Sequence, residues 1–484
     1  MEKPNLSGIK KIAYASAFLM LLTAVFFTGL FMTPPAQRYN DDAFNETFNN
    51  ILRNHFSAPT EEQLWEGAIY GLINSLDDPF SRYFDAETFN RFREGFGESY
   101  VGIGVTVENF NEQVLIRYVW PDSPAQRAGL TAGDIIVYVD GEDFSNKSFA
   151  ETTAALLGEE NTEVTIGFKR VDINEIIYVT ITREQIANPS VEAEIFEVDD
   201  YKIGYLVINT FGDETANNVA LYMDTFSESG IDGLIIDLRD NGGGGLNALL
   251  DILDLFLSKD AQDFPLFSIE LRNAQNNIEN YYPNTNVSFD FDITVLINGQ
   301  SASASEVFSA AMQEYGEYQV IGEASYGKGT LQSSIALSSI RGNYVHLTIG
   351  VWKTALGNWV DRNGGTNGVQ PNIEVTQNPA LFLPPIYLSD DEFYQFDQVS
   401  NRIKIAQDIL NTLGYTVRND GYFDLNTQDK ITEFQIDQGL DESGRLNSQT
   451  ASALSEALFN YKQNPLNDTQ LQEAILYLIG GLND

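Results

Sequence analysis

Residues 293–316, with the sequence ITVLINGQSASASEVFSAAMQEYG, decide the fold of the central part of this 484-residue chain. The apolar, largely β-branched run at 293–297 predicts a buried strand, and the polar residues 298–300 end it. Ser303 and Glu306 then fit a capping box in front of a run of apolar residues at helical spacing. The stretch therefore predicts a strand, a short turn and a helix that begins at Ser303.

A serine at this place lies at the positive end of a helix. The backbone amide of Ala304 has no partner within that helix and points towards any oxygen that Ser303 attacks. Ser303 is therefore a candidate nucleophile. An isolated S-x-x-E pattern is more often only a helix cap, so the assignment needs a base elsewhere in the chain.

The composition leaves lysine as the conventional base for this serine. The chain has no cysteine, and its histidines are His55, in a predicted N-terminal helix, and His346, in a predicted strand where a structural role is expected. Lys328 lies between Gly327 and Gly329, where the backbone can turn sharply. A neutral lysine can take the proton of a serine, provided that burial lowers the pKa of the amine from about 10.4 to near 7, at a cost of roughly 4–5 kcal/mol.

The segments SASASE (301–306) and YGKGTLQ (326–332) resemble the carboxyl-terminal processing (tail-specific) serine proteases. The resemblance runs from about residue 40 to 380. It implies that Ser303 is the nucleophile, Lys328 the general base and Gln332 the polar residue that orients the lysine. It also implies an α/β protease core of the crotonase-like (ClpP-like) kind.

Two glycine-rich stretches also resemble nucleotide-binding loops. The predicted strand 233–240 leads into a glycine run and a helix, and three residues formally satisfy the dinucleotide fingerprint: Gly243, Gly245 and Ala248. No acidic residue caps the strand that follows. Residues 322–328 imitate a phosphate loop, but Gly329 stands where a Ser or Thr would bind magnesium, and a strand-like sequence follows. We therefore expect no cofactor and no metal.

The first of these loops also matches the D-x-R-x-N-x-G-G motif of the protease family. This match implies that the amide of Gly243 or Gly244, together with that of Ala304, forms an oxyanion hole, in which each donor is worth about 3 kcal/mol at the transition state. The family usually has proline where Gly242 stands. The sequence leaves open which of the two amides points into the site.

Residues 98–185 resemble a PDZ domain. YVGIGV (100–105) is similar to a carboxylate-binding loop, and SPAQRAGLTAGDIIVYVDG (123–141) is the more diagnostic segment. In such a domain, consecutive amides bind the terminal carboxylate of a peptide, which pairs as an added strand. The contacts implied for the peptide are five consecutive residues: Tyr100, Val101, Gly102, Ile103 and Gly104. The alternative is a PDZ-like domain that only spaces its neighbours.

The charge of the chain excludes some partners. With 69 acidic and 28 basic residues, its formal charge is −41, which argues against binding of nucleic acid or anionic lipid by the main body. Absence of cysteine excludes disulfides and thiolate metal sites, and two histidines weaken any zinc site.

The N-terminus predicts a membrane anchor. Residues 12–32 are uncharged and long enough to cross a bilayer, and Lys3, Lys10 and Lys11 precede them. This pattern predicts a single-pass protein with its N-terminus inside the cell and its catalytic body outside the cytoplasm. A cleaved signal peptide is the alternative.

The C-terminal part changes character after the acidic linker. Residues 397–465 predict three helices joined by loops and resemble the small peptidoglycan-binding domain of cell-wall enzymes. A helical interaction module without glycan affinity is the alternative. Residues 466–484 predict one more amphipathic helix.

These observations predict a multidomain α/β and α+β protein. Its expected parts are a cytoplasmic stub with a transmembrane anchor (1–37), a helical segment (38–97), a PDZ domain (98–185), a serine protease core (186–385), a linker (386–396), a peptidoglycan-binding-like domain (397–465) and a C-terminal helix (466–484). The expected function is extracytoplasmic endoproteolysis of protein C-terminal tails, with peptidoglycan as a further partner. A non-catalytic cell-wall scaffold is the alternative, and the sequence leaves open a homo-oligomer.

Overall fold

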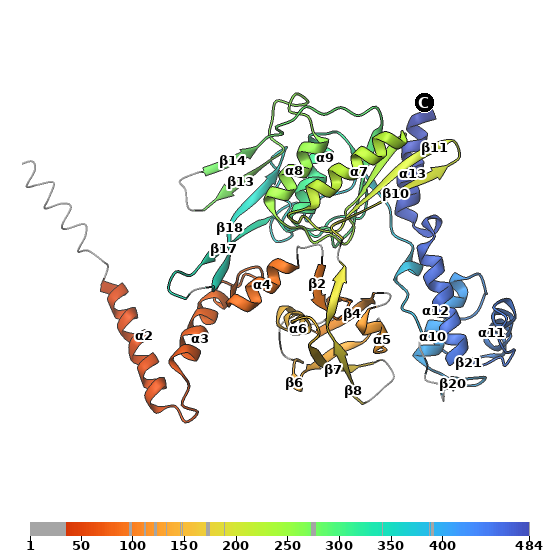
Figure 1. Cartoon of the computed structure of the whole chain (residues 1–484), viewed down its shortest axis with the longest axis horizontal. Helices are drawn as coiled ribbons and strands as arrows, with labels where there is room; N and C mark the ends of the chain where they lie inside the picture. Colours follow the sequence, from red (N-terminus) through yellow and green to blue (C-terminus); the bar gives the residue numbers. More distant parts are fainter. Residues whose placement is uncertain are drawn as a thin grey trace, which may run out of the picture. The chain divides into compact units, whose positions relative to one another are not determined.

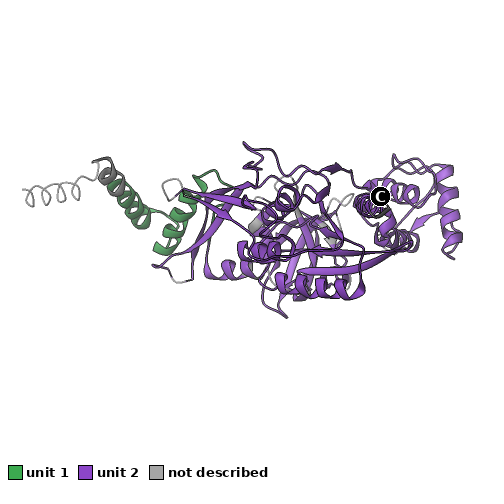
Figure 2. Cartoon of the chain, turned by 90° about the horizontal axis from the view of Figure 1, so that it is seen from above, with its two compact units in different colours: residues 1–83 green, residues 84–484 purple. Residues whose placement is uncertain are grey.

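The computed structural model describes residues 35–483 except 96–98, 111–112, 121–122, 132, 146, 148, 171–174, 188, 273–276, 341, 387 and 389–391. The chain divides into two compact units, residues 1–83 and 84–484, which Figure 2 colours separately. Each unit is described here by itself.

The described part of the first unit is a pair of helices, α2 (Pro35–Asn54) and α3 (Glu61–Asn74). Thr60 begins α3 with a capping box, in which its hydroxyl accepts the Gln63 amide at 3.1 Å. The rings of Phe48 and Trp65 pack together with centroids 4.8 Å apart. Apolar contacts between aromatic side chains therefore hold the two helices together. The short strand β1 (Arg82–Phe84) leads into the second unit.

The prediction of an N-terminal transmembrane helix needs correction. The segment 12–32 lies outside the described residues. Within the parts of 35–483 that the structure describes, no helix combines the length and the apolar character that a bilayer requires. The helix α2 is long enough, but it carries Arg38, Asp41, Asp42 and Glu46. The supported fold class is a multidomain α/β protein, and a membrane helix is not a supported part of it.

The second unit begins with α4 (Ala86–Glu94), followed by a small β-domain. Five strands of this domain form one antiparallel sheet, to which β6 (Glu142–Asp143) adds at β5: β3 (Val105–Phe110), β4 (Gln113–Val119), β5 (Ile135–Val139), β7 (Glu163–Lys169) and β8 (Ile177–Thr182). The helices α5 (Pro124–Arg127) and α6 (Phe149–Leu156) accompany it, and β2 (Ser99–Gly102) pairs with β9 (Glu184–Ala187). Ile116, Val164 and Ile166 lie fully buried in its core.

The central sheet has the order β10-β11-β12-β15-β16-β19, and all its pairs are parallel except β10–β11. Its strands are β10 (Val191–Val198), β11 (Tyr201–Ile208), β12 (Gly233–Asp237), β15 (Asp292–Ile297), β16 (Gln319–Gly322) and β19 (Ile373–Glu374). The strands β12 and β15 are almost entirely apolar because helices bury both of their faces.

Different helices cover the two faces of this sheet (Figure 1). One face packs against α7 (Thr215–Ser229), α8 (Leu246–Phe256) and α9 (Ala304–Glu314). The other face packs against the C-terminal helix α13 (Thr469–Asn483), through Leu471, Ala474 and Leu478. The end of the chain thus forms part of the hydrophobic core that supports β12 and β15.

A second, antiparallel sheet carries the lysine segment. Four of its five strands are β13 (Phe267–Leu271), β14 (Asn277–Tyr281), β17 (Thr330–Ala336) and β18 (Tyr344–Thr354). His346, expected to be structural, lies on β18, where its Nδ1 is 2.8 Å from the Ser334 hydroxyl and its ring packs against Phe84 and Phe92.

The helices predicted for the C-terminal part are present. They are α10 (Asn401–Thr412), α11 (Leu425–Asp437) and α12 (Ser448–Gln463), with the strand pair β20 (Phe393–Tyr394) and β21 (Leu446–Asn447). A 3-10 turn (Pro379–Phe382) precedes this domain, and another (Pro465–Asn467) leads from α12 to α13. Ile403, Phe423 and Phe434 lie in its own buried core.

Candidate active site

Ser303 has a strained backbone at the junction of β15 and α9. Its φ is 57° and its ψ is −115°, a combination outside the regions that L-residues ordinarily occupy. Such strain costs on the order of 1–3 kcal/mol and persists only where the surrounding structure enforces it. The predicted turn between strand and helix is therefore present, and it presents Ser303 at the N-cap of α9.

A buried carboxylate holds this backbone in place. Glu306 is fully buried and accepts the Ser303 amide at 2.8 Å, which is the carboxylate half of the predicted capping box. It also accepts the Ser325 hydroxyl at 2.6 Å and the amides of Gly327 and Lys328 at 2.7 and 2.9 Å. Burial raises the pKa of Glu306, and these four hydrogen bonds oppose that rise.

The backbones of Ser303 and Lys328, the expected nucleophile and base, bond to the same oxygen atom of this carboxylate. The amides of Ser303 and Lys328 both bond to Oε2 of Glu306, so the two backbone nitrogens lie within the summed length of two hydrogen bonds. The structure therefore brings together the segments that sequence reasoning singled out, although they belong to different sheets and are separated by α9 and β16.

The loop that carries Lys328 is fixed on both sides of the lysine. The Tyr326 amide donates to the Ser301 carbonyl at 2.9 Å, and the Gly329 amide donates to Asp361 at 3.2 Å. The carbonyl of Lys328 accepts the indole N–H of Trp352 at 2.9 Å. Because so many polar groups of this backbone are bonded, the lysine is attached to a rigid support.

Gln332 lies on β17, next to an irregularity in the pairing of β17 and β18. Its Nε2 donates to the hydroxyls of Thr330 and Thr348 at 2.9 and 3.1 Å. With the amide nitrogen engaged in this way, the side-chain oxygen is left to accept from another donor. Sequence reasoning singled out Gln332 but not Thr348, since only the pairing of β17 and β18 brings Thr348 opposite Gln332.

The glycine loop after β12 packs directly against the serine turn. A Cβ on Gly243 would lie 2.7 Å from the Ala302 carbonyl oxygen and 2.9 Å from the Ala304 nitrogen. Asn241 joins the two loops, because its carbonyl accepts the Ala302 amide at 3.0 Å and the Ser305 hydroxyl at 2.9 Å. A loop covered in this way leaves little room for a dinucleotide pyrophosphate, so the geometry disfavours that alternative.

The structure distinguishes between the two glycine amides. The Gly243 amide donates to the side-chain oxygen of Asn241 at 2.8 Å, so it is already engaged. Phe211 bonds to the Gly243 carbonyl and the Gly245 amide, which turns the Gly244 amide the other way. Among the described residues, the amides of Gly244 and Ala304 have no intramolecular acceptor. These two N–H groups are the better pair for a negatively charged oxygen.

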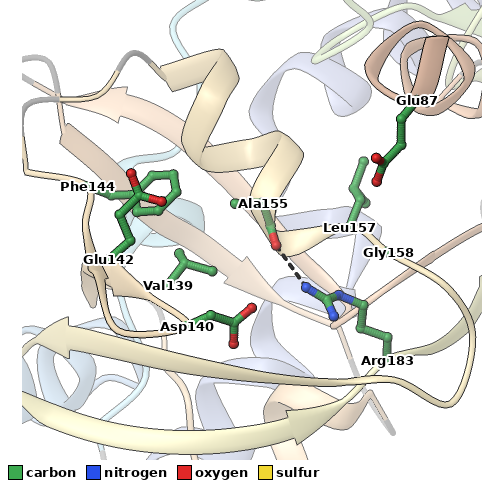
Figure 3. A pocket seen from close by; sticks show the side chains of 9 residues that line it. All are labelled: Glu87, Val139, Asp140, Glu142, Phe144, Ala155, Leu157, Gly158 and Arg183. Atoms are coloured by element: carbon green, nitrogen blue, oxygen red, sulfur yellow. Dashed lines mark hydrogen bonds between the residues drawn. The ribbon is translucent and has the colours of Figure 1, made fainter. Parts of the chain in front are cut away.

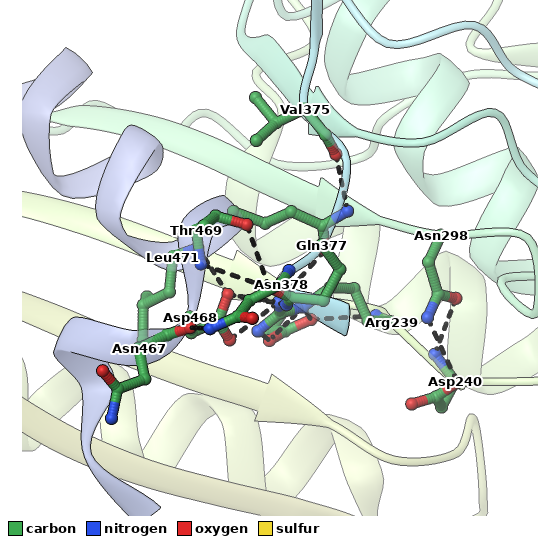
Figure 4. A network of polar contacts seen from close by, with 12 residues as sticks. Arg239, Asp240, Asn298, Val375, Gln377, Asn378, Asn467, Asp468, Thr469 and Leu471 are labelled. Atoms are coloured by element: carbon green, nitrogen blue, oxygen red, sulfur yellow. Dashed lines mark hydrogen bonds and ion pairs between the residues drawn. The ribbon is translucent and has the colours of Figure 1, made fainter. Parts of the chain in front are cut away.

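A charged network supports the same glycine loop at its beginning (Figure 4). Asp237, at the end of β12, accepts the Tyr205 hydroxyl at 2.7 Å and pairs with Arg239 at 2.6 Å. Arg239 also forms an ion pair of 2.8 Å with Asp468, just before α13. Burial opposes the charge on Arg239, but the two carboxylates hold its pKa above the ordinary value. Sequence reasoning missed Asp468 because no local pattern relates it to the loop.

The five predicted peptide contacts of the β-domain are not equivalent. A groove of about 230 Å³ is lined by Tyr100, Ile103 and Gly104 together with Leu156 and other residues, some of them in the α6 region. Tyr100, Val101 and Gly102 all lie on β2, which pairs with β9, but of these three only Tyr100 lines the groove.

A second cavity, of about 400 Å³, lies between the β-domain and α4 (Figure 3). Arg183 lines it with Glu87 and Asp140. Its guanidinium donates to the carbonyls of Ala155, Leu156 and Glu163 and to the Thr162 hydroxyl. Arg183 is thus bound into the domain as a structural residue.

Four family models match the chain. Peptidase family S41 matches residues 202–375, a PDZ domain matches 115–170, a putative peptidoglycan binding domain matches 399–454, and the N-terminal domain of the activating protease CtpB matches 36–88. The matched regions correspond to the central domain, the β-domain, the C-terminal helical domain and the helix pair described above.

Two curated relatives from Bacillus subtilis extend over nearly the whole chain. The carboxy-terminal processing protease CtpA is 31% identical, with 90% of this chain and 89% of the relative covered, and CtpB is 30% identical over 90% and 88%. Among solved structures, the photosystem II D1 C-terminal processing protease is similar, with a TM-score of 0.50 and 25% identity over 68% of this chain and 85% of that one. On this evidence the chain belongs to peptidase family S41, the carboxy-terminal processing serine proteases, and it carries a PDZ and a peptidoglycan-binding domain.

Proposed function

We propose that this protease binds the C-terminal tails of proteins in its PDZ groove and cleaves them outside the cytoplasm with a Ser303–Lys328 dyad. The observation that carries the proposal is the shared oxygen of Glu306, which ties the backbones of both residues to one buried atom. The strained backbone of Ser303 is further support, because such strain gathers at reactive residues.

In the proposed reaction, the neutral amine of Lys328 takes the proton of the Ser303 hydroxyl while Oγ attacks the carbonyl carbon of the scissile peptide bond. The carbonyl oxygen becomes negative and accepts hydrogen bonds from the amides of Gly244 and Ala304. The ammonium of Lys328 then gives its proton to the leaving amine. Water repeats the sequence on the acyl-enzyme and releases the second product. The oxygen of Gln332 accepts a hydrogen bond from the amine and orients it.

The dyad is tested by two substitutions and a matched control. Ser303→Ala and Lys328→Ala should each abolish cleavage of a folded reporter that carries an unstructured C-terminal tail. Lys404→Ala removes an exposed lysine of α10 and should leave cleavage unchanged. Tail products are measured by mass spectrometry and folding by circular dichroism. Wild-type activity in either dyad variant would reject the assignment.

Tail capture is tested by changing the substrate and leaving the enzyme unchanged. A PDZ groove that binds a terminal carboxylate should lose affinity when the tail ends in an amide, so KM should rise while the cleavage site stays the same. Equal kcat/KM for the two tails would indicate that the PDZ domain is only a spacer.

Cleavage outside the cytoplasm is supported by the match to a peptidoglycan-binding domain. Whether peptidoglycan is a partner is tested by a pull-down of the protein with insoluble peptidoglycan.

A further inference from the structure

We propose that Asp468 is a positioning residue of the active site, which acts through Arg239 on the loop that supplies the Gly244 amide. This inference rests on the proposed function. Asp468 lies far beyond residues 202–375, the part of the chain that matches peptidase family S41. The C-terminal segment would thereby complete a protease site whose reacting groups all lie in the central domain.

The contact between Asp468 and Arg239 is largely shielded from solvent, and each side chain makes several hydrogen bonds. The side chains of the two residues are 17% and 11% exposed. Nη1 of Arg239 bonds to Asp468, and it also donates to Oε1 of Gln470 at 3.2 Å. The other nitrogens of the guanidinium, Nε and Nη2, bond to Asp237. One planar cation therefore joins the end of β12 to the start of α13, which a flexible ammonium could not do with the same geometry.

Asp468 is itself held rigidly. Its carboxylate accepts the Leu471 amide at 2.9 Å, as expected of a residue that caps α13. It also accepts the side-chain nitrogen of Gln377 at 2.7 Å. Nearby, the side-chain nitrogen of Asn378 donates to the Asn467 carbonyl at 2.8 Å. These bonds join the residues on either side of the segment 379–467. The two connections between the C-terminal domain and the central domain therefore lie side by side (Figure 4).

The path from Arg239 to the reacting oxygen is short. Asp240 follows with a φ of 60° and exchanges two hydrogen bonds with Asn298, of 3.0 and 3.1 Å. Asn241 then bonds to the serine turn and to the Gly243 amide, and Gly244 comes next in the loop. Because this loop has positive φ at three of its residues, it depends on contacts at its ends to keep one conformation. Arg239 supplies the contact at the first end.

The experiment compares Asp468→Asn with wild type and with Glu433→Gln, which removes an exposed acid of α11. Asp468→Asn should lower kcat on a tailed substrate about 10- to 100-fold with KM unchanged, because the side chain supports an oxyanion donor and not the bound tail. Binding of a peptidyl boronate, which places a negative oxygen in the same position, should weaken by the same factor. Glu433→Gln should leave both quantities unchanged.

The inhibition constant for the boronate is measured at a temperature where circular dichroism shows the variant to be fully folded, so it separates positioning from loss of stability. Arg239→Lys is a second variant that keeps the charge and should show the same pattern. A kcat and an inhibition constant within twofold of wild type in Asp468→Asn, with wild type active and Ser303→Ala inactive, would overturn this inference alone. An inactive wild type or an active Ser303→Ala would instead overturn the proposed function.

Discussion

Replacement of Glu306 is the most direct test of how the site is held together. In Glu306→Ala, the amides of Ser303, Gly327 and Lys328 lose their common acceptor. An unsatisfied buried amide costs about 1–3 kcal/mol, so three of them cost roughly 3–9 kcal/mol before any water enters the space. The variant should therefore unfold at a clearly lower temperature.

The loss of activity should exceed what instability explains. Ser303 keeps its strained φ only while the surroundings enforce it, so we expect the hydroxyl to move when the carboxylate is removed. A displacement of 1 Å at a reacting group costs about 10²-fold in rate. We therefore expect kcat/KM to fall by at least that factor at a temperature where the variant is still folded.

The comparison needs a carboxylate of the same helix. Glu314, at the end of α9, is half-buried and accepts the Leu356 amide at 2.8 Å in a solvent-exposed hydrogen bond. Glu314→Ala should cost at most about 1 kcal/mol, since an exposed donor is solvated by water. Unfolding is followed by circular dichroism and cleavage by a fluorescent tail peptide. If Glu306→Ala keeps both its melting temperature and its kcat/KM close to those of Glu314→Ala, our account of the site is wrong.

The raised pKa of Glu306 gives this test a pH dependence. A carboxyl group whose pKa is higher in the folded state contributes stability below its unfolded pKa, and this contribution is lost as the pH rises through the folded value. Glu306→Gln does not titrate. The stability of wild type relative to Glu306→Gln should therefore be largest below about pH 4 and should decline towards neutral pH. Urea unfolding of both proteins at several pH values measures this difference.

Three further substitutions test other parts of the structure. Gly243→Ala should lower kcat sharply because its Cβ would meet the serine turn at a φ of 103°, whereas Gly242→Ala, with nothing within 4 Å, should keep wild-type kinetics. Thr348→Val removes one of the hydroxyls that hold Gln332 and should lower kcat several-fold with KM unchanged, which steady-state kinetics will show. Burial lowers the pKa of Lys462 to about 8, so its contribution to stability is lost as the pH falls through that value. Lys462→Met should make the melting temperature less dependent on pH between 7 and 10.

The sequence predicted the serine turn because all of its signals are local. The apolar strand, the polar turn and the spacing of Ser303 and Glu306 lie within one short stretch, and β15 and α9 have nearly the expected bounds. The wider role of Glu306 was missed for the opposite reason. Its other donors lie at residues 325–328, and only the fold brings them to the carboxylate.

The choice between the two candidate oxyanion amides also needed coordinates. The glycine run did not distinguish the amide of Gly243 from that of Gly244. In the structure the side chain of Asn241 accepts the Gly243 amide, which leaves the Gly244 amide as the candidate. The amphipathic pattern of the last helix likewise predicted α13 but not its partner. An apolar stripe on a helix predicts that another element will cover it. Only the fold shows that, for α13, this element is the central sheet.

Glu306 contacts the lysine segment through backbone amides. Burial raises the pKa of Glu306, and the groups that oppose the rise are the Ser325 hydroxyl and backbone amides. The helix end that carries Ser303 adds a positive field of its own near this first-turn residue. The carboxylate is thus stabilised by hydroxyl and amide donors, and it supports the backbone of Lys328 through the amide of that residue.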